Sequence, residues 1–168
     1  MNFIKTNWLY ILLLISIILI GIYNYKKYRV APSFTLKQIQ FTNSNNQSFT
    51  LENFSNKNAI VIFAASWCRD CREEIPALEI MRQALGSNDF YFVTLTDDSF
   101  EKIERFKTAT QSTFDFYKLK KSLKEYNIHS IPTAYIINKK GDIVFSYVGN
   151  YSWNTPKTIK KIRTLVSQ

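Results

Sequence analysis

The 168-residue sequence contains few of the residues that build metal centres and tight loops: two cysteines, one histidine, four glycines and four prolines. Two cysteines cannot form the disulfide framework of a small secreted protein, and they cannot complete a four-cysteine zinc site. With 46% hydrophobic residues, the chain is too apolar to be intrinsically disordered. Its length allows one domain of ordinary size and a short additional segment.

Acidic residues are missing from the first 29 positions, which contain four of the 22 cations. Without those four cations the formal charge falls from +9 to +5, and the remaining charges are spread along the chain. No nucleic-acid-binding motif accompanies this modest excess. We therefore expect no nucleic-acid partner.

Between Lys5 and Lys26 the sequence has no charged residue, and leucine and isoleucine dominate positions 9–20. As a helix rising 1.5 Å per residue, these 20 residues would be about 30 Å long, the thickness of the hydrocarbon core of a bilayer. Aromatic residues flank the run on both sides, as they do at membrane interfaces. We therefore expect residues 1–30 to be a membrane anchor with one transmembrane helix at about 8–25.

A cleaved signal peptide is the alternative, because the most apolar part of the run covers only about 12 residues. No small-x-small cleavage site follows it, which favours an anchor that is kept. The orientation stays open at this level. Three cations follow the run and one precedes it, which by the positive-inside rule places the rest of the chain in the cytoplasm. Long domains, however, can cross regardless of local charge.

Residues 31–168 alternate between strand-like and helix-like patterns. Positions 34–41 and 49–51 predict a leading hairpin, and the continuous apolar run at 59–65 predicts a central strand buried on both faces. Further strands are expected at 90–95, 133–138 and 142–148, and helices at 68–85, 99–108, 122–127 and 155–166. This order predicts one three-layer α/β domain with a mixed central sheet.

Both cysteines lie in one run, Trp67-Cys68-Arg69-Asp70-Cys71, where the central strand ends and the first long helix of the domain begins. Cysteines three residues apart at a helix start share one face and can form a disulfide without moving the backbone. The unpaired N–H groups and the helix dipole at this place stabilise a thiolate on Cys68. We predict that Cys68 attacks substrate disulfides and that Cys71 resolves the mixed disulfide. Half of a metal site and an incidental buried pair are the weaker alternatives.

A second constellation, Ile131-Pro132-Thr133, stands at the start of the predicted strand at 133–138. A proline there often marks only a boundary, but together with a C-x-x-C pair it predicts a cis-proline loop packed against the cysteines. Such a loop would expose the backbone of Ile131 for strand-like pairing with a substrate next to Cys68. Trp67 is expected either to shield the disulfide or to pack in the core.

The chain resembles the TlpA/ResA-like branch of the thioredoxin superfamily, which consists of membrane-anchored thiol–disulfide oxidoreductases facing outside the cytoplasm. The resemblance covers about residues 31–168. It rests on four runs: Ala64-Ala65-Ser66-Trp67-Cys68, Cys71…Glu74…Pro76, Ile131-Pro132-Thr133 and Asn138-Lys139-Lys140-Gly141. The leading hairpin resembles the N-terminal extension of that branch, which plain thioredoxin lacks.

The resemblance implies a thioredoxin-like fold, no cofactor, no metal and a domain exported across the membrane. It also implies that Glu74, three residues after the second cysteine, tunes cysteine protonation; an ordinary solvated carboxylate is the alternative. Protein disulfides or dithiols are the implied substrates, such as the thiols of apocytochrome c before haem attachment. The expected partner is a membrane-embedded electron donor. We also expect a monomer.

One departure from the branch concerns the position before the second cysteine, which is Asp70 where many relatives have proline. Arg69 favours a thiolate on Cys68 and Asp70 opposes it, so the two effects partly cancel. The direction of electron flow therefore stays open, with a reductant as the implied role.

Two other functions on the same fold remain as alternatives. A thiol peroxidase would typically have a threonine and a proline at the positions of Ala65 and Val61, so the hydroxyl that polarises peroxide is missing. A copper-binding or copper-delivery module would have three residues between its cysteines, where this chain has two.

Overall fold

The computed structural model describes residues 2–54, 56–86 and 89–167, with side chains from Trp8 onward. It divides into two compact units, Met1–Val30 and Ala31–Gln168. The first unit is one helix, α1 (Asn2–Arg29). Its segment Trp8–Arg29 is long and apolar enough to cross a bilayer, with a mean hydropathy of 2.0. This criterion is one of length and composition, and a signal sequence near the N-terminus meets it as well.

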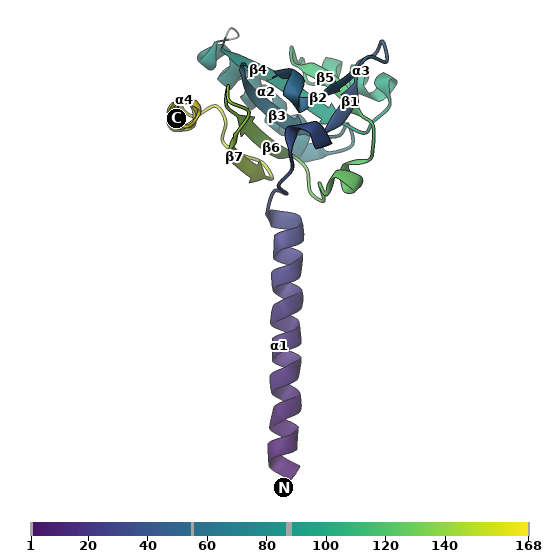
Figure 1. Ribbon diagram of the computed structural model, residues 1–168, viewed down its shortest axis with the longest axis vertical. Coiled ribbons are helices and arrows are strands. Elements are labelled where there is room, and N and C mark those ends of the chain that lie inside the picture. The colour runs from purple at the N-terminus through teal and green to yellow at the C-terminus, as the bar shows by residue number, and fades with distance from the viewer. Residues whose placement is uncertain (1, 55, 87–88, 168) are drawn as a thin grey trace. The chain divides into compact units, whose positions relative to one another are not determined.

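The second unit is built on a mixed β-sheet. Its described strands are β1 (Gln40–Thr42), β2 (Ser48–Thr50), β3 (Asn58–Phe63), β4 (Phe90–Thr96), β5 (Asp115–Leu119), β6 (Thr133–Ile137) and β7 (Ile143–Val148). They form one sheet in the order β2-β1-β5-β4-β3-β6-β7 (Figure 1). Strands β3, β4 and β5 are parallel to one another, and the other neighbouring pairs are antiparallel.

Helices and short turns connect these strands. The described α-helices of this unit are α2 (Arg69–Leu85), α3 (Phe100–Ala109) and α4 (Pro156–Val166), and the 3₁₀ turns are η1 (Leu36–Gln38), η2 (Leu51–Phe54) and η3 (Leu123–Tyr126). Local signals in the sequence define the helix starts. The hydroxyl oxygen of Ser99 caps α3, and that of Thr155 caps α4, whose first residue is a proline.

The central strand β3 divides the hydrophobic core into two clusters. All six of its residues are buried. Ile60 and Ile62 belong to a cluster with apolar side chains of α2, α3 and α4. Val61 and Phe63 belong to a second cluster, to which η2, η3 and the segment before β1 contribute. The three layers are therefore the helices, the sheet, and a cover of 3₁₀ turns and connecting chain.

The predicted α/β class, mixed sheet, leading hairpin and helices are confirmed, but one strand was not expected. Strand β5 lies inside the sheet, paired with β4 on one side and with β1 on the other. Asp115 and Lys118 interrupt its apolar pattern, so the sequence resembles a polar loop. Pairing on both edges, which is a tertiary effect, makes it a strand.

The first strand of the hairpin is shorter than the predicted 34–41, because only Gln40–Thr42 pairs in the sheet. Residues before it form η1, in which the side chain of Gln38 accepts a hydrogen bond from the backbone N–H of Thr35 at 2.8 Å. Phe34 instead packs edge-on against Tyr135, with ring centroids 4.7 Å apart. The apolar residues of this segment therefore cover the sheet face instead of extending the sheet.

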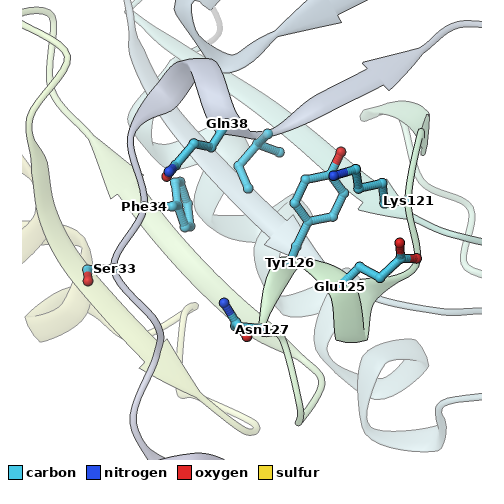
Figure 2. Close-up of a pocket in the computed structure, with 8 residues that line it drawn as sticks. Ser33, Phe34, Gln38, Lys121, Glu125, Tyr126 and Asn127 are labelled. Carbon is cyan, nitrogen blue, oxygen red and sulfur yellow. The ribbon is translucent and has the colours of Figure 1, made fainter.

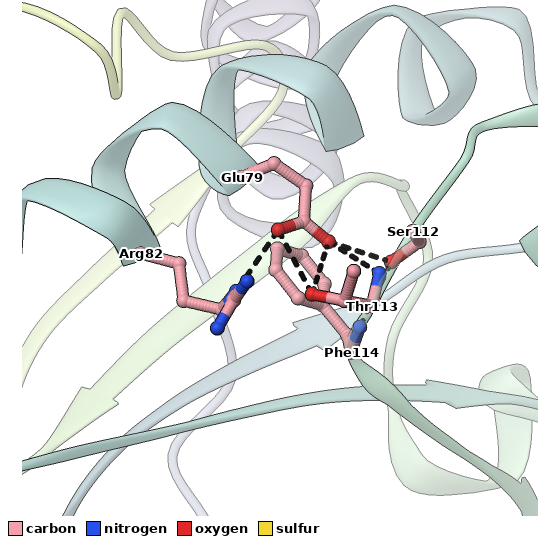
Figure 3. Close-up of polar contacts among 5 residues, drawn as sticks. All are labelled: Glu79, Arg82, Ser112, Thr113 and Phe114. Carbon is pink, nitrogen blue, oxygen red and sulfur yellow. Dashed lines mark hydrogen bonds and ion pairs between the residues drawn. The ribbon is translucent and has the colours of Figure 1, made fainter. Parts of the chain in front are cut away.

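A partly buried polar contact fastens α2 to the chain that leads into β5 (Figure 3). The carboxylate of Glu79 accepts hydrogen bonds from the backbone N–H and the hydroxyl of Thr113, and it forms an ion pair with Arg82 at 2.9 Å. Burial alone would raise the pKa of Glu79, but the bonds from Thr113 and Arg82 outweigh burial and lower this pKa. The ionised carboxylate thus holds α2, which carries the cysteines, against the sheet.

Candidate active site

The two cysteines lie at the N-terminus of α2 and form a disulfide, with Cα atoms 5.3 Å apart. Cys68 is the N-cap residue, and its Sγ accepts a hydrogen bond from the backbone N–H of Cys71 at 3.1 Å. Cys68 retains 6% exposure and Cys71 only 1%, so Cys68 is the more exposed of the two residues. This is the arrangement expected when the first cysteine reacts with a substrate and the second resolves the product.

A short turn carries the chain from β3 into α2. The N–H of Ala64 still bonds to the carbonyl of Leu95 on β4 at 3.1 Å, and the N–H of Cys68 bonds to the carbonyl of Ala65 at 3.1 Å. Cys68 therefore emerges at the end of a strand that is buried on both faces, and the core fixes its backbone.

The predicted proline loop lies beside the disulfide. The Ile131–Pro132 peptide bond is cis, as expected, and the carbonyl oxygen of Ile131 is 3.8 Å from Sγ of Cys68. The sheet brings these distant segments together, because the antiparallel pairing of β3 with β6 places Phe63 opposite Thr133. The residues just after β3 are therefore next to those just before β6.

Glu74 is buried, with 1% of its surface exposed, so its interpretation as a solvated carboxylate is wrong. Its Oε1 accepts hydrogen bonds from the indole N–H of Trp153 and from the backbone N–H of Tyr151, the latter at 3.2 Å. Its Oε2 has no hydrogen-bond partner among the described residues. Burial raises the pKa of Glu74 to about 7, although the bonds from Trp153 and Tyr151 counteract it. Glu74 can therefore exchange a proton near neutral pH.

Two residues of this site, Tyr151 and Trp153, were not singled out in the sequence. Trp153 is fully buried and belongs to the core cluster that contains both cysteines. Its ring packs against that of Tyr151, with centroids 4.8 Å apart. No fixed spacing relates these two residues to the C-x-x-C run, because they lie on the segment between β7 and α4. The presence of two aromatic residues in an otherwise polar stretch is the only signal they give.

The residues around the disulfide differ in exposure. Trp67 is 68% exposed, which excludes a core role for its side chain. The guanidinium of Arg69 pairs with the carboxylate of Glu73 at 2.8 Å on the exposed side of α2. Since Arg69 has this partner one turn along the helix, its charge is not directed at Cys68 alone.

No group of three or more histidine, cysteine and acidic side chains is placed to hold a metal ion within the residues that the structure describes. A cleft of about 280 Å³ lies between the segment before β1 and η3 (Figure 2). It contains none of the predicted site residues, since its lining consists of Ser33, Phe34, Gln38, Ile39, Lys121, Glu125, Tyr126 and Asn127.

Comparison with known proteins supports the chemistry that this geometry suggests. Residues 28–146 match the family model described as the AhpC/TSA family. The chain belongs to the AhpC/TSA family. Within that family's matched region lie the disulfide, Glu74 and the cis-proline loop, whereas Trp153 lies beyond it.

Individual relatives of this AhpC/TSA-family chain are thioredoxin-like. The thioredoxin-like protein YneN of Bacillus subtilis is 34% identical, with 71% of this chain and 69% of YneN covered. The thiol-disulfide oxidoreductase ResA of Oceanobacillus iheyensis is 29% identical, with 70% of this chain and 64% of ResA covered. Among solved structures, StoA from Bacillus subtilis is 25% identical, with a TM-score of 0.55 over 80% of this chain and 97% of that one.

These likenesses confirm the predicted resemblance to the TlpA/ResA-like branch. This member of the AhpC/TSA family is a thioredoxin-like thiol–disulfide oxidoreductase with an apolar N-terminal helix.

Proposed function

We propose that the protein is a membrane-anchored reductant of protein disulfides that acts outside the cytoplasm. One observation carries the proposal: a disulfide at the start of α2 whose outer sulfur lies 3.8 Å from the carbonyl oxygen before a cis-proline. In this role the protein would either reduce a cysteine disulfide of apocytochrome c to the two thiols needed for haem attachment, or keep the thiols of exported proteins reduced in general.

In the proposed reaction, Cys68 of the reduced protein attacks one sulfur of a substrate disulfide as a thiolate. The substrate S–S bond breaks, the other substrate sulfur leaves as a thiolate and takes up a proton, and a mixed disulfide with Cys68 remains. Cys71 then loses its proton and attacks Sγ of Cys68, which releases the second substrate thiol. Two electrons have passed from the cysteine pair to the substrate, and the pair is left as the disulfide seen here.

The start of α2 supports the role of Cys68 as the attacking sulfur. Its Sγ accepts the N–H of Cys71 at 3.1 Å and occupies the N-cap position, where helix N–H groups and the dipole stabilise negative charge. A dithiol of a membrane-embedded partner is the proposed source of the electrons that reduce the pair again.

Glu74 is the proposed proton acceptor for Cys71. The two residues are three apart on α2, and side chains at this spacing share a helix face. A group whose pKa is about 7 can take the thiol proton during resolution and release it afterwards at neutral pH. The atom available for this exchange is Oε2 of Glu74, which has no hydrogen-bond partner in the described part of the chain.

The substrate is proposed to bind over Trp67 and the loop Ile131-Pro132-Thr133. Trp67 offers an exposed apolar ring next to Cys68. The loop would pair with an extended substrate segment through the backbone of Ile131. Such main-chain pairing suits many protein substrates, because it does not depend on side-chain identity.

For the location, we propose that α1 is an uncleaved anchor and that the domain is exported. The length and hydropathy of Trp8–Arg29 support the anchor, and the resemblance to the TlpA/ResA-like branch supports the orientation. A C-terminal fusion to alkaline phosphatase, which is active only after export, tests this. Active fusions in the membrane fraction are expected; inactive fusions or fusions in the soluble fraction would contradict the proposed location.

The Cys71→Ser variant tests the exchange reaction, because it can form the mixed disulfide but cannot resolve it. We expect Cys71→Ser to form mixed disulfides with exported proteins. These adducts should disappear when a reductant is added and should be absent from the double variant Cys68→Ser Cys71→Ser. Adducts to apocytochrome c would identify that substrate class. Complete absence of adducts dependent on Cys68 would overturn the proposed function.

A second candidate, a thiol peroxidase, is favoured by the match to the AhpC/TSA family model. In this reaction the Cys68 thiolate would attack one peroxide oxygen and break the O–O bond, and the other oxygen would leave as water or an alcohol after taking up a proton. Cys68 would be left as a sulfenic acid, and the thiol of Cys71 would condense with it to the disulfide with loss of a water molecule. Peroxide consumption by the reduced protein, compared with its rate of disulfide reduction, separates the two candidates. The proposed reductant should reduce disulfides much faster than it consumes peroxide.

A further inference from the structure

We propose that Asp98 is a positioning residue for thiol–disulfide exchange, holding the turn that delivers Cys68 to the substrate. This inference rests on the proposed function. Asp98 follows β4 in sequence and is not part of the C-x-x-C run, α2 or the proline loop.

Asp98 is a buried carboxylate aimed at the turn between β3 and α2. Only 7% of its surface is exposed. Its Oδ2 accepts a hydrogen bond from the backbone N–H of Ser66 at 2.6 Å and another from the hydroxyl of Thr96 at 3.2 Å. The N–H of Asp98 in turn donates to the same Thr96 hydroxyl at 3.2 Å. Thr96, itself fully buried, therefore fixes the carboxylate from within the fold.

The bond to Ser66 acts together with a second bond in holding this turn to the end of β4. The other is the bond from the N–H of Ala64 to the carbonyl of Leu95. The parallel pairing of β3 with β4 ends at Phe63 and Leu95, and the bond from Ala64 to Leu95 follows directly after it. Beyond that point, the carboxylate of Asp98 accepts the backbone N–H of Ser66, in place of a backbone carbonyl of a neighbouring strand.

Ser66 is two residues before Cys68 and one before Trp67, so the bond between Asp98 and Ser66 acts on the position of both side chains. Sγ of Cys68 must approach a substrate sulfur in line with the S–S bond that breaks. A displacement of about 1 Å at a reacting atom can cost on the order of a hundredfold in rate. A turn released from Asp98 would move both the attacking sulfur and the exposed ring beside it.

The Asp98→Asn variant removes the negative charge but keeps the hydrogen bond, because the Oδ1 of asparagine can still accept the N–H of Ser66. The Asp98→Ala variant removes both the charge and the hydrogen bond. A matched control is the neighbouring carboxylate Asp97, whose Oδ2 accepts the N–H of Leu123 at 3.0 Å and does not hold the turn. If Asp98 acts by position, Asp98→Asn should behave like wild type, and Asp98→Ala should not.

The experiment uses the reduced full chain in detergent and measures two rates for the folded fraction: reduction of a peptide disulfide and alkylation of Cys68 by iodoacetamide. We expect Asp98→Ala to slow peptide reduction at least tenfold and to change alkylation, which needs no in-line approach to a disulfide, by less than threefold. Asp98→Asn and Asp97→Ala should reduce the peptide within threefold of wild type. A purely structural role would lower the unfolding midpoint and leave both rates of the folded fraction unchanged.

The inference is overturned if Asp98→Ala reduces the peptide at the wild-type rate, if Asp97→Ala is equally slow, or if asparagine fails to restore the rate. Should Asp98→Ala not fold, Thr96→Val removes only the hydroxyl that fixes the carboxylate, and a reduction rate equal to wild type would overturn the inference in the same way. A wild-type chain that alkylates normally but reduces no disulfide would instead overturn the proposed function.

Discussion

Replacing Glu74 with glutamine should change how the stability of the protein depends on pH. In the folded protein the pKa of Glu74 is about 7, whereas the ordinary value is 4.5. Between these two pH values the folded state keeps the proton that the unfolded chain gives up. The folded state of the wild type therefore loses stability as pH rises from about 4.5 through 7.

The size of this loss follows from the pKa difference. One pKa unit corresponds to about 1.4 kcal/mol, so the rise from 4.5 to about 7 is worth roughly 3 kcal/mol. Glutamine stays neutral at every pH and keeps an oxygen that can accept the N–H groups of Trp153 and Tyr151. The stability of Glu74→Gln relative to wild type should therefore increase by about 3 kcal/mol between pH 4 and pH 8.

Urea unfolding of the oxidised full chain in detergent, followed by tryptophan fluorescence, measures this difference at several pH values. The matched control is Glu73→Gln, which changes the exposed neighbour on the same helix and breaks only its pair with Arg69. That variant should follow the pH dependence of the wild type. If the difference between Glu74→Gln and wild type stayed constant from pH 4 to pH 8, the buried carboxyl would not have a raised pKa. Its proposed role as a proton acceptor would then lose its basis.

Three further substitutions test the contacts around this site. Trp153→Phe removes the indole hydrogen bond that lowers the pKa of Glu74, so the pH midpoint of the stability loss should move upward by about one unit. Glu79→Ala removes the acceptor of the N–H of Thr113 and should reduce the free energy of unfolding at pH 7 by about 1 kcal/mol, because the freed N–H is exposed and can bond to water. That cost should shrink as pH falls through the lowered pKa of Glu79, because the protonated wild type loses the same interaction; urea unfolding at pH 7 and pH 3 checks this. Tyr135→Phe removes the hydroxyl that donates to the carbonyl of Pro32 at 2.7 Å, and a loss of about 1 kcal/mol in urea unfolding is expected.

Most of the fold could be predicted because its signals are local. The run at 59–65 is apolar at every position, and only a strand buried on both faces suits such a run at that length. The helix at 69–85 begins at a cysteine cap and ends at Gly86, which adopts a positive φ of 86°. Strand β5 was not predicted because its pattern contains charges, and because one of its two partners, β1, comes from a distant part of the chain.

The sequence by itself determined where the cysteine pair of this protein lies. A strand, two cysteines three residues apart and a helix are contiguous, so the position of Cys68 at the helix start follows from the chain's covalent order. The apolar run that becomes Trp8–Arg29 of α1 is equally local, since length and composition define it.

Only the tertiary structure decided what surrounds that pair. Trp153 lies 79 positions from Glu74 and Asp98 lies 32 positions from Ser66, and the sheet order brings each pair within hydrogen-bonding distance. The same sheet order decides the protonation of Glu74, because burial raises a pKa only when distant segments exclude water from the carboxyl. Sequence spacing determines which residues are neighbours along the chain. The burial of Glu74 and its protonation depend instead on contacts that form only when the sheet assembles.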